Sequence, residues 1–570
     1  MRHTLYRLAS LPPVSAVIFC GILYLLTLAL LPRDYFWITD NDNKFLQVQS
    51  ILSSGYARYD IPWTGQDIDP AFEFNPLPAP FSQVSGGRLY SIFSPVFAAL
   101  SAVPYHLFGF RGLYLLPLFG SLSLLFGVSR IGALLGLAPA VRHAAVLLAG
   151  LATPVWFYSV VFWEHTIAVS CCVWAVFWLL KFAETRAFSA LWPGCLLAAL
   201  AVWFRDELYL FCLVFALAAV AVDARGLATT WLKAAAVMAA GLLPLWLFQG
   251  WAIGHPFGFH LGAHLFTASG IAGHLASRPQ VFYNLFLAAH PDRAVSVLVT
   301  APLILILLLP GGLFRRFGAW PAMIALGYGL VLAAVSLGGY LLPGSPIVRL
   351  LQTNSLLAAA PALVLAAGLF MTGAPTFGLR GLPLVHAIAA AYLVGYALAA
   401  PLAGSTGIHW GNRFVLVLYP LFALLAAARG YDWLRGAGRL RAAGGALAAA
   451  LVLVSLAAQL YSCTLLARKT DFNHRLTQAV AARPEQVVVS TVWWAPQTLS
   501  RVFFEKTLFY AATQEQFDTL GTRLRANGIR DILVLTAAGG NPVRGSVQRI
   551  GDNGLGFFSL DLQPYELRGR

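Results

Sequence analysis

The stretch VSAVIFCGILYLLTLALL, residues 14–31, contains no charged side chain. As an α-helix it is long enough to cross the roughly 30 Å of hydrocarbon in a bilayer. Backbone groups find no water to bond inside lipid, so a stretch of this kind must be helical there. Comparable apolar stretches recur along most of the chain, and only 11% of its 570 residues are charged, against about 25% in an ordinary soluble domain. The sequence therefore predicts a mainly α-helical protein that crosses a membrane many times.

The apolar stretches predict about thirteen membrane-spanning helices. They lie at residues 14–32, 113–130, 142–162, 164–182, 188–204, 208–223, 230–252, 295–314, 318–342, 354–372, 382–402, 412–428 and 441–463. The segment 91–109 contains Pro95 and Pro104, either of which can break a helix, and this favours a re-entrant or interfacial segment over a further span.

Basic residues beside the spans predict the orientation, because they collect in cytoplasmic loops. Arg2 and Arg7 are expected in the cytoplasm, and so are the later pairs and clusters Lys181 with Arg186, Arg225 with Lys233, Arg315 with Arg316, and Arg429, Arg435, Arg439 and Arg441. The same rule accounts for the net charge of +15 without a nucleic-acid partner. The first span lacks a small-x-small cleavage site, so it is expected to stay as a signal anchor.

Two domains are expected. Residues 1–463 form the membrane domain, with a first external loop at 33–90, and residues 464–570 form an extracytoplasmic tail. In the tail, EQVVVSTVWW and IRDILVLTAA are typical of strands, and TQEQFDTLGTRLRANG is typical of an amphipathic helix that ends at a glycine. This pattern predicts a small α/β domain. Composition rich in Ala, Leu and Arg suggests a bacterial host, and so the bacterial inner membrane.

Acidic residues crowd into the first external loop, which holds Asp34, Asp40, Asp42, Asp60, Asp67, Asp69 and Glu73. Asp40 and Asp42 lie directly after the first span, in TDNDNKF. A carboxylate there can act as a general base, or bind a divalent cation as a cofactor. The alternative is that Asp40 or Asp42 only caps the helix that follows, since Asp is a favoured N-cap residue.

Two further groups of ionisable residues lie at external helix ends. WEHTIAV carries Glu164 and His165 at the start of a helix, and WFRDELYL carries Arg205, Asp206 and Glu207 in a turn between two helices. Ionisable groups are costly near the apolar part of a membrane, so they predict a functional site on the side of the first loop. The alternative for Arg205 and Asp206 is a local ion pair in a tight turn.

Two later arginines are candidate phosphate ligands. Arg349 lies in SPIVRLLQTN and Arg413 in IHWGNRFVLVLYP, both at external helix entrances. A guanidinium group binds phosphate oxygens with two parallel hydrogen bonds and stays charged, which suits a lipid phosphate at the membrane surface. The alternative is interfacial anchoring by a side chain that reaches out of the bilayer.

Metal and redox sites are not indicated by the sequence. His260 and His264 in HPFGFHLGAHLF have the spacing of helix-borne ligands, and His255 precedes them, but no carboxylate completes an HExxH-like pattern. The six cysteines show no CxxC spacing, so neither a zinc site nor a disulfide framework is predicted.

Four motifs follow one another along the chain: TDNDNKF, the Pro-containing YSIFSPVFAALSAVPYHLFG, WEHTIAV and WGNRFVLVLYP. In the order of these motifs, over about residues 14–430, the chain resembles the GT-C superfamily of polytopic glycosyltransferases. Members of this superfamily use polyprenyl- or dolichyl-phosphate sugars and include mannosyltransferases and aminoarabinose transferases. The resemblance implies an inverting transfer to a glycan, lipid or protein acceptor, with Asp40 or Asp42 as the base. It also implies phosphate contacts by Arg205, Arg413 and Arg349, and a positioning role for Glu164.

Other functions remain open at this point. A transporter or flippase would show pseudo-repeats and charges at the middle of spans, whereas the charges here lie at external helix ends. A ligase or polymerase acting on lipid-linked oligosaccharides needs the same external arginines and carboxylate. A non-catalytic scaffold is the third alternative.

Overall fold

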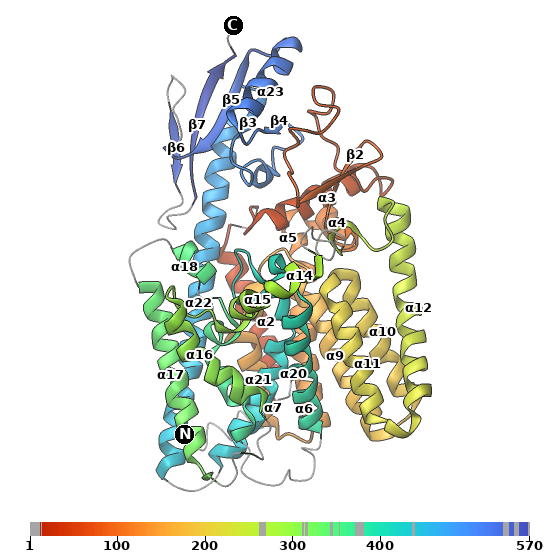
Figure 1. Ribbon diagram of the computed structural model, residues 1–570, viewed down its shortest axis with the longest axis vertical. Coiled ribbons are helices and arrows are strands. Elements are labelled where there is room, and N and C mark those ends of the chain that lie inside the picture. Colours follow the sequence, from red (N-terminus) through yellow and green to blue (C-terminus); the bar gives the residue numbers. More distant parts are fainter. Residues whose placement is uncertain are drawn as a thin grey trace.

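Helices dominate the computed structural model, and they stand beneath a small five-stranded sheet (Figure 1). It describes residues 12–567 apart from 13, 33, 262–269, 310–312, 314–316, 342–345, 353, 371–380, 436–438, 540–546 and 552–557. The end of the molecule that carries the sheet is called the sheet end below. The predicted mainly α fold with a small α/β tail is confirmed.

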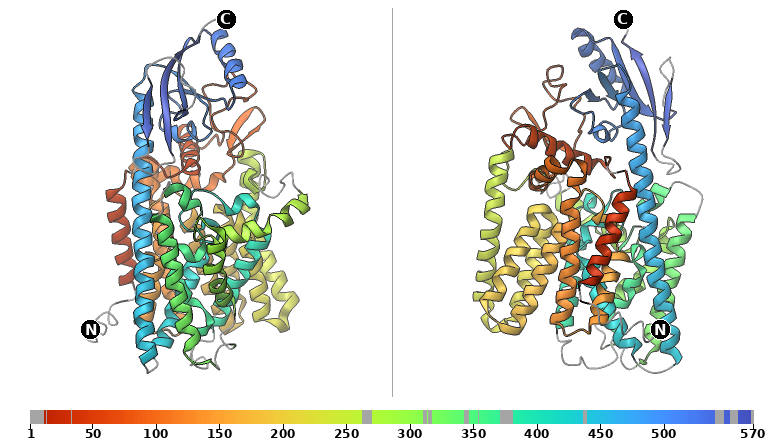
Figure 2. Two further views of the ribbon diagram at one scale, coloured as in Figure 1. Left: turned by 60° about the vertical axis from the view of Figure 1, so that its left-hand side comes forward. Right: turned by 180° about the vertical axis from the view of Figure 1, so that it is seen from behind.

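The long apolar helices run along the long axis of the molecule (Figures 1 and 2). They are α2 (Ser15–Leu30), α6 (Leu115–Leu134), α7 (Pro139–Leu151), α9 (His165–Thr185), α10 (Phe188–Phe204), α11 (Tyr209–Val222), α12 (Leu227–Ile253), α16 (Arg293–Leu308), α17 (Trp320–Leu341), α20 (Leu382–Ala399), α21 (Leu418–Leu434) and α22 (Arg439–Ala481). Within the described residues, six helices are long and apolar enough to cross a membrane, and five shorter apolar helices accompany them. The chain is a multi-pass membrane protein, and the count of thirteen spans stays a prediction.

One predicted span is not a regular helix. Residues 354–370 form α19 (Leu356–Ala359) and the 3-10 turns η5 (Pro361–Ala366) and η6 (Gly368–Phe370). Side chains of neighbouring helices bind the freed backbone groups: the Ala362 amide donates to Ser455 Oγ at 2.9 Å, and Gln459 Nε2 donates to the Ala359 carbonyl at 2.8 Å. Irregular backbone is tolerated at membrane depth where protein surrounds it. The prediction of a helix over 354–372 is therefore wrong.

Of two other predicted spans, one is shorter than expected and the other is displaced by six residues. In 142–162, α7 ends at Leu151, and the short α8 (Val155–Ser159) follows a break that contains Pro154. In 412–428, α21 begins only at Leu418, after the 3-10 turns η8 (Leu402–Ser405) and η9 (Arg413–Val415). Both breaks lie beside the functional residues predicted in those motifs.

The first external loop folds into α3 (Thr39–Ser53), a long irregular segment and the hairpin β1 (Ser82–Ser85) and β2 (Arg88–Ser91). The segment 91–109 then contains α4 (Pro95–Phe108), with Ser94 as its N-cap, and α5 (Phe110–Leu113) follows it. The loop from α12 to α16 contains α14 (Gly270–Ala276), α15 (Arg278–Phe282) and the π-helical turn η3 (Tyr283–Leu287), and α18 (Pro346–Gln352) follows α17.

The tail sheet has the strand order β4-β3-β5-β7-β6. Its strands are β3 (Val487–Ser490), β4 (Thr507–Tyr510), β5 (Asp531–Ala537), β6 (Gln548–Gly551) and β7 (Ser559–Glu566). The first three strands are parallel to one another, and β7 is antiparallel to β5 and β6. Helix α23 (Gln514–Ala526) begins with a capping box at Thr513 and Gln516, as the amphipathic pattern predicts.

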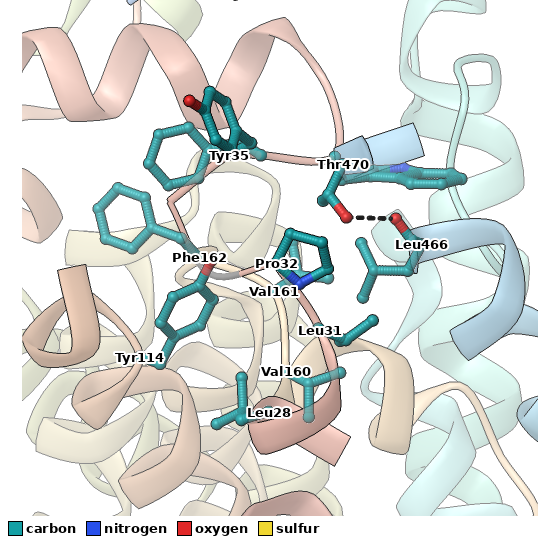
Figure 3. Close-up of a pocket in the computed structure, with 12 residues that line it drawn as sticks. Leu28, Leu31, Pro32, Tyr35, Tyr114, Val160, Val161, Phe162, Leu466 and Thr470 are labelled. Atoms are coloured by element: carbon teal, nitrogen blue, oxygen red, sulfur yellow. Dashed lines mark hydrogen bonds between the residues drawn. The ribbon is translucent and has the colours of Figure 1, made fainter. Parts of the chain in front are cut away.

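Helix α22 links the membrane part to the sheet without a break (Figure 2). The predicted domain boundary at 463/464 falls inside this helix, which continues to Ala481. Figure 3 shows a small apolar pocket where α22, through Leu466 and Thr470, meets the end of α2 and residues 160–162. The sheet is thus held on a continuous helix that packs against the start of the first loop.

The first loop also packs directly against the sheet. Trp63 Nε1 donates to the Leu508 carbonyl at 2.9 Å, and the Tyr510 amide donates to the Phe74 carbonyl at 2.9 Å. Arg523 of α23 forms ion pairs with Asp69, at 2.8 Å, and with Glu73. Two of the seven acidic residues of the loop therefore serve this contact.

Candidate functional site

Helix α3 carries a row of buried polar residues at the sheet end. Asp40, Asn41, Asp42, Asn43 and Lys44 are each at most 5% exposed. Buried polar groups need partners. Asn41 donates to the Phe162 carbonyl at 2.9 Å, and Asn43 to Gln497 of the tail at 2.9 Å. The two asparagines therefore fix α3 between the membrane helices and the tail.

The structure separates the two candidate aspartates. Asp40 accepts a hydrogen bond of 2.7 Å from Arg413, whereas Asp42 accepts one of 2.6 Å from Ser500 of the tail. Residues two apart in a helix point in different directions, while residues four apart share a face, so Lys44 lies on the side of Asp40. Asp40 thus belongs to a charged group under the first loop, and Asp42 belongs to the contact with the tail.

Glu164, at the start of α9, connects the charges of α3 with those after α10. Its carboxylate lies 3.5 Å from Lys44 Nζ and 2.9 Å from Arg205 Nη1. Arg205 also pairs with Glu207 in the same turn, and not with Asp206 as in the alternative considered above. We name these residues the charged cluster: Asp40, Lys44, Glu164, Arg205, Glu207 and Arg413.

Aromatic rings surround the cations of this cluster. Lys44 Nζ lies 3.5 Å from the centroid of the Phe93 ring, and the Arg413 guanidinium lies 4.7 Å from Trp163 and 4.8 Å from Phe414. Such contacts stabilise a cation that has lost part of its hydration. The cluster therefore holds its positive groups in place by rings as well as by carboxylates.

The charges also set the ionisation of Asp40. Burial acts to raise the pKa of this carboxyl, but Arg413 and Lys44 outweigh burial, and the pKa of Asp40 lies below its ordinary value. Asp42 shows the opposite result, because burial outweighs its hydrogen bond with Ser500 and raises its pKa to about 7. At neutral pH Asp40 is an ionised carboxylate.

Several polar atoms of the cluster are buried without a hydrogen-bond partner among the described residues. They are Lys44 Nζ, Glu164 Oε2 and Arg413 Nε. An unsatisfied buried donor or acceptor costs about 1–3 kcal/mol, and more when charged. Two of the three, Lys44 Nζ and Glu164 Oε2, face each other at 3.5 Å and belong to residues that line a cavity.

That cavity is small, with a volume of about 20 Å³, and its lining includes Lys44, Phe93, Glu164, Arg205, Glu207 and His260. We call it the charged cavity. Next to it lies a larger apolar groove of about 500 Å³, lined by residues of α11, α12 and α20 such as Leu213, Trp246 and Ala399. Asp206, Glu207 and His260 line both spaces. A charged space and an apolar one therefore meet at these three residues.

The other predicted site residues have varied surroundings. Asp206 lies 3.1 Å from His260 Nδ1. His165 is fully buried, and its ring packs on Tyr158 and Trp163 at 5.0 and 4.6 Å. Arg349 of α18 is buried and interacts electrostatically with Tyr461 of α22. A phosphate contact by Arg349 stays a prediction.

A metal site is not built by the described residues, in which no three His, Cys, Asp or Glu side chains come together. His264 lies outside the described part of the chain. Each carboxylate of the charged cluster already faces an arginine or lysine. We therefore derive no chemical step through a divalent cation.

Two residues of this site received no definite role from the sequence motifs. Lys44 is part of the TDNDNKF motif, and its spacing of four from Asp40 could have placed both on one helix face. His260 was considered only as a metal ligand. Its contact with Asp206 joins residues 54 positions apart and left no local signal.

No family model and no curated protein matches this chain. Among solved structures it is similar to ArnT from Cupriavidus metallidurans bound to undecaprenyl phosphate, with 11% identity over 97% of this chain and 99% of that one, and a TM-score of 0.49. The apo state of the same protein gives 12% identity over 97% and 99%, and 0.48. The oligosaccharyltransferase of Archaeoglobus fulgidus in complex with Zn and sulfate gives 12% identity over 91% and 68%, and 0.46.

Proposed function

We propose that the chain is an integral-membrane glycosyltransferase that transfers a sugar from a polyprenyl-phosphate donor to an acceptor. The observation that carries the proposal is the junction of the charged cavity with the apolar groove at Asp206, Glu207 and His260. A polyprenyl-phosphate sugar has the matching two parts, a charged phosphate and a long apolar chain. The groove is large and almost wholly apolar in its lining, which suits isoprene units.

In this proposal Lys44 and Arg205 bind the donor phosphate. Both line the charged cavity, and Lys44 Nζ has no hydrogen-bond partner in the described part of the chain. As the bond to the anomeric carbon breaks, negative charge grows on the phosphate oxygens. Fixed cations in a site of low dielectric stabilise that charge most strongly in the transition state.

Asp40 is proposed as the base that takes the proton of the acceptor. Its lowered pKa keeps the carboxylate ionised, and loss of the Arg413 partner raises that pKa and makes the carboxylate a stronger base. Asp40 is paired with Arg413 in this structure. When Arg413 turns toward the donor phosphate, Asp40 is released toward the acceptor hydroxyl or amine. The acceptor attacks the face opposite the phosphate, so the configuration inverts.

Glu164 and Glu207 are proposed to position the cationic side chains of Lys44 and Arg205 rather than to react. Glu164 holds Lys44 and Arg205 together, and Glu207 holds Arg205 from the other side. Asp42 is proposed to position α3 through Ser500.

We further propose that the sheet end faces the outside of a bacterial inner membrane. Basic residues at the opposite end of the long helices support this orientation, for example Lys181, Lys233 and Arg439. Sugar transfer would then take place at the outer surface of the membrane.

The test is transfer of radiolabelled sugar from polyprenyl-phosphate donors to envelope acceptors by membranes that contain the wild type or Asp40→Asn at matched expression. Transfer by the wild type and loss in the variant supports the proposal. Equal labelling with both, or none with either across monosaccharide donors, contradicts it. Labelling only from oligosaccharide donors would identify a ligase or polymerase instead.

A further inference from the structure

A separate polar cavity lies at the sheet end, where the end of α12 meets the β1–β2 hairpin and the chain after α3. It has a volume of about 440 Å³, and its lining includes Arg58, Asp60, Arg88, Tyr90 and Trp251. We call it the hairpin pocket. None of these five residues belongs to the charged cluster.

The hairpin pocket carries an excess of positive charge. The Asp60 side chain is only 3% exposed, and Arg58 binds both of its oxygens, through Nε at 3.1 Å and through Nη2. Arg88 Nη1 lies 3.8 Å from Asp60 Oδ1, which is too long for a hydrogen bond, and its side chain is 55% exposed. Arg58 alone therefore satisfies the carboxylate, and the guanidinium of Arg88 is available to an anion.

Aromatic residues place the pocket at the level of the lipid headgroups. Trp251 lies in the last turn of the apolar helix α12 and is 68% exposed. Its ring packs edge-on against Tyr59 at 5.5 Å. Exposed tryptophans at the ends of spanning helices are typical of the membrane–water interface.

The hairpin tip leaves room for a headgroup. Gly86 lines the pocket, and Gly86 and Gly87 have φ values of +55° and +71°, with nothing within 4 Å of the point where a Cβ would lie on either residue. Backbone without side chains allows a ligand to come close. We propose that the hairpin pocket binds the phosphate of an anionic membrane lipid, with Arg88 as its main contact and Arg58 as the second.

A lipid bound there would lie beside the charged cavity. Strand β2 begins at Arg88 and leads within five residues to Phe93, whose ring contacts Lys44. The ring of Tyr90 in the same strand lies 5.8 Å from that of Phe259, next to His260. Lipid binding therefore steadies the strand that leads into Phe93 and Ser94, which line the charged cavity.

The test uses the purified full-length protein in detergent, with phosphatidylglycerol binding measured by native mass spectrometry. Wild type is expected to bind phosphatidylglycerol about tenfold more tightly than Arg88→Ala, because one charge-assisted contact is lost. Arg88→Lys should recover part of the affinity. Arg111→Ala, an exposed arginine on the same end but outside the pocket, should bind as the wild type does.

Three outcomes overturn the proposal. Equal binding by wild type and Arg88→Ala, or equal binding of phosphatidylcholine, removes the role of the pocket. Displacement of the lipid by glycerol phosphate at similar concentration assigns the pocket to a soluble phosphate instead. Because no sugar transfer is measured, a failure here is distinct from a failure of the proposed glycosyltransferase activity.

Discussion

Arg413 Nη1 donates a hydrogen bond of 2.7 Å to Asp40 Oδ2 and so joins residues that are 373 positions apart in the chain. Asp40 comes from the first external loop, and Arg413 comes from the turn before α21. The break of the predicted span 412–428 is what allows this contact, because Arg413 lies in a short 3-10 turn rather than in a long helix.

Exchanging Asp40 for Asn is expected to lower sugar transfer by about 10²–10⁴-fold, the range for loss of a general base. Asp42→Asn is the matched control, since it lies on the same helix, is equally buried and faces Ser500. It should keep most of the activity. Initial rates in detergent with protein amounts matched by size-exclusion chromatography measure both. A larger loss in Asp42→Asn would reverse the assignment.

Removing the charge of Lys44 is expected to weaken binding of the donor. Lys44→Met should raise the KM for the polyprenyl-phosphate sugar by roughly 10–100-fold, because one charge-assisted contact with the phosphate is lost. Inhibition by free polyprenyl phosphate should weaken in parallel. Lys181→Met, near the end of α9 that lies away from the charged cavity, controls for the loss of a lysine. Unchanged inhibition in Lys44→Met would place the phosphate elsewhere.

Filling the apolar groove should discriminate between donors by chain length. Ala399 lines the groove, while its neighbour Leu398 does not and is 64% exposed. Ala399→Trp is expected to raise the KM for long-chain donors by roughly tenfold and to leave donors of two isoprene units unaffected, since the short chain makes little contact there. Leu398→Trp should behave as the wild type. A uniform effect on both donors would argue against the groove as the lipid site.

Asp42 should make folding stability depend on pH. Its pKa, about 7 in the folded protein, lies above the ordinary value of 3.8, so between these values the folded state holds a proton that the unfolded state has lost. The free energy of unfolding therefore falls as pH rises from about 4 to 7 and levels off above that.

Asp42→Asn mimics the protonated form, and it should remove this slope and melt a few degrees higher than the wild type at pH 8. Thermal unfolding between pH 5 and 8 measures the difference. Asp471→Asn, a partly exposed carboxylate on α22, should leave the slope in place. Parallel curves for wild type and Asp42→Asn would show that Asp42 carries no such proton.

The contact between the first loop and the sheet should depend on Arg523. Asp69 is fully buried and accepts hydrogen bonds from Arg523 and from the Phe74 amide. Arg523→Ala leaves a buried carboxylate without its cation, which typically costs about 3–5 kcal/mol. Faster proteolysis of the loop at 55–81 is expected, and Asp69→Asn in the same chain should restore part of the protection. If Arg523→Ala alone changes nothing, the pair does not hold this contact.

Hydropathy predicted the long helices because burial in lipid demands a continuous apolar surface, but it did not reveal the irregular segment at 354–370. That segment is as apolar as a span. Its backbone is satisfied by Ser455 and Gln459, about 100 residues away, and a hydropathy profile records no such partners.

The same limit applies to the site. The sequence placed Asp40, Glu164, Arg205 and Arg413 at external helix ends, because ionisable groups are rare there without a task. The sequence could not show which acidic residues of the first loop belong to the site and which contact the tail. Glu73, for example, pairs with Arg523, which lies 450 positions away in the chain.

Helix α22 has 43 residues and is about 65 Å long at 1.5 Å per residue, roughly twice the thickness of the hydrocarbon it crosses. No break in the helix separates the part in the bilayer from the part that carries the sheet. Each residue of a helix turns it by about 100°. A single residue inserted beyond Thr470 would therefore rotate the whole sheet about the helix axis, carry Ser500 and Gln497 away from α3, and uncouple the tail from the first loop while leaving every span intact.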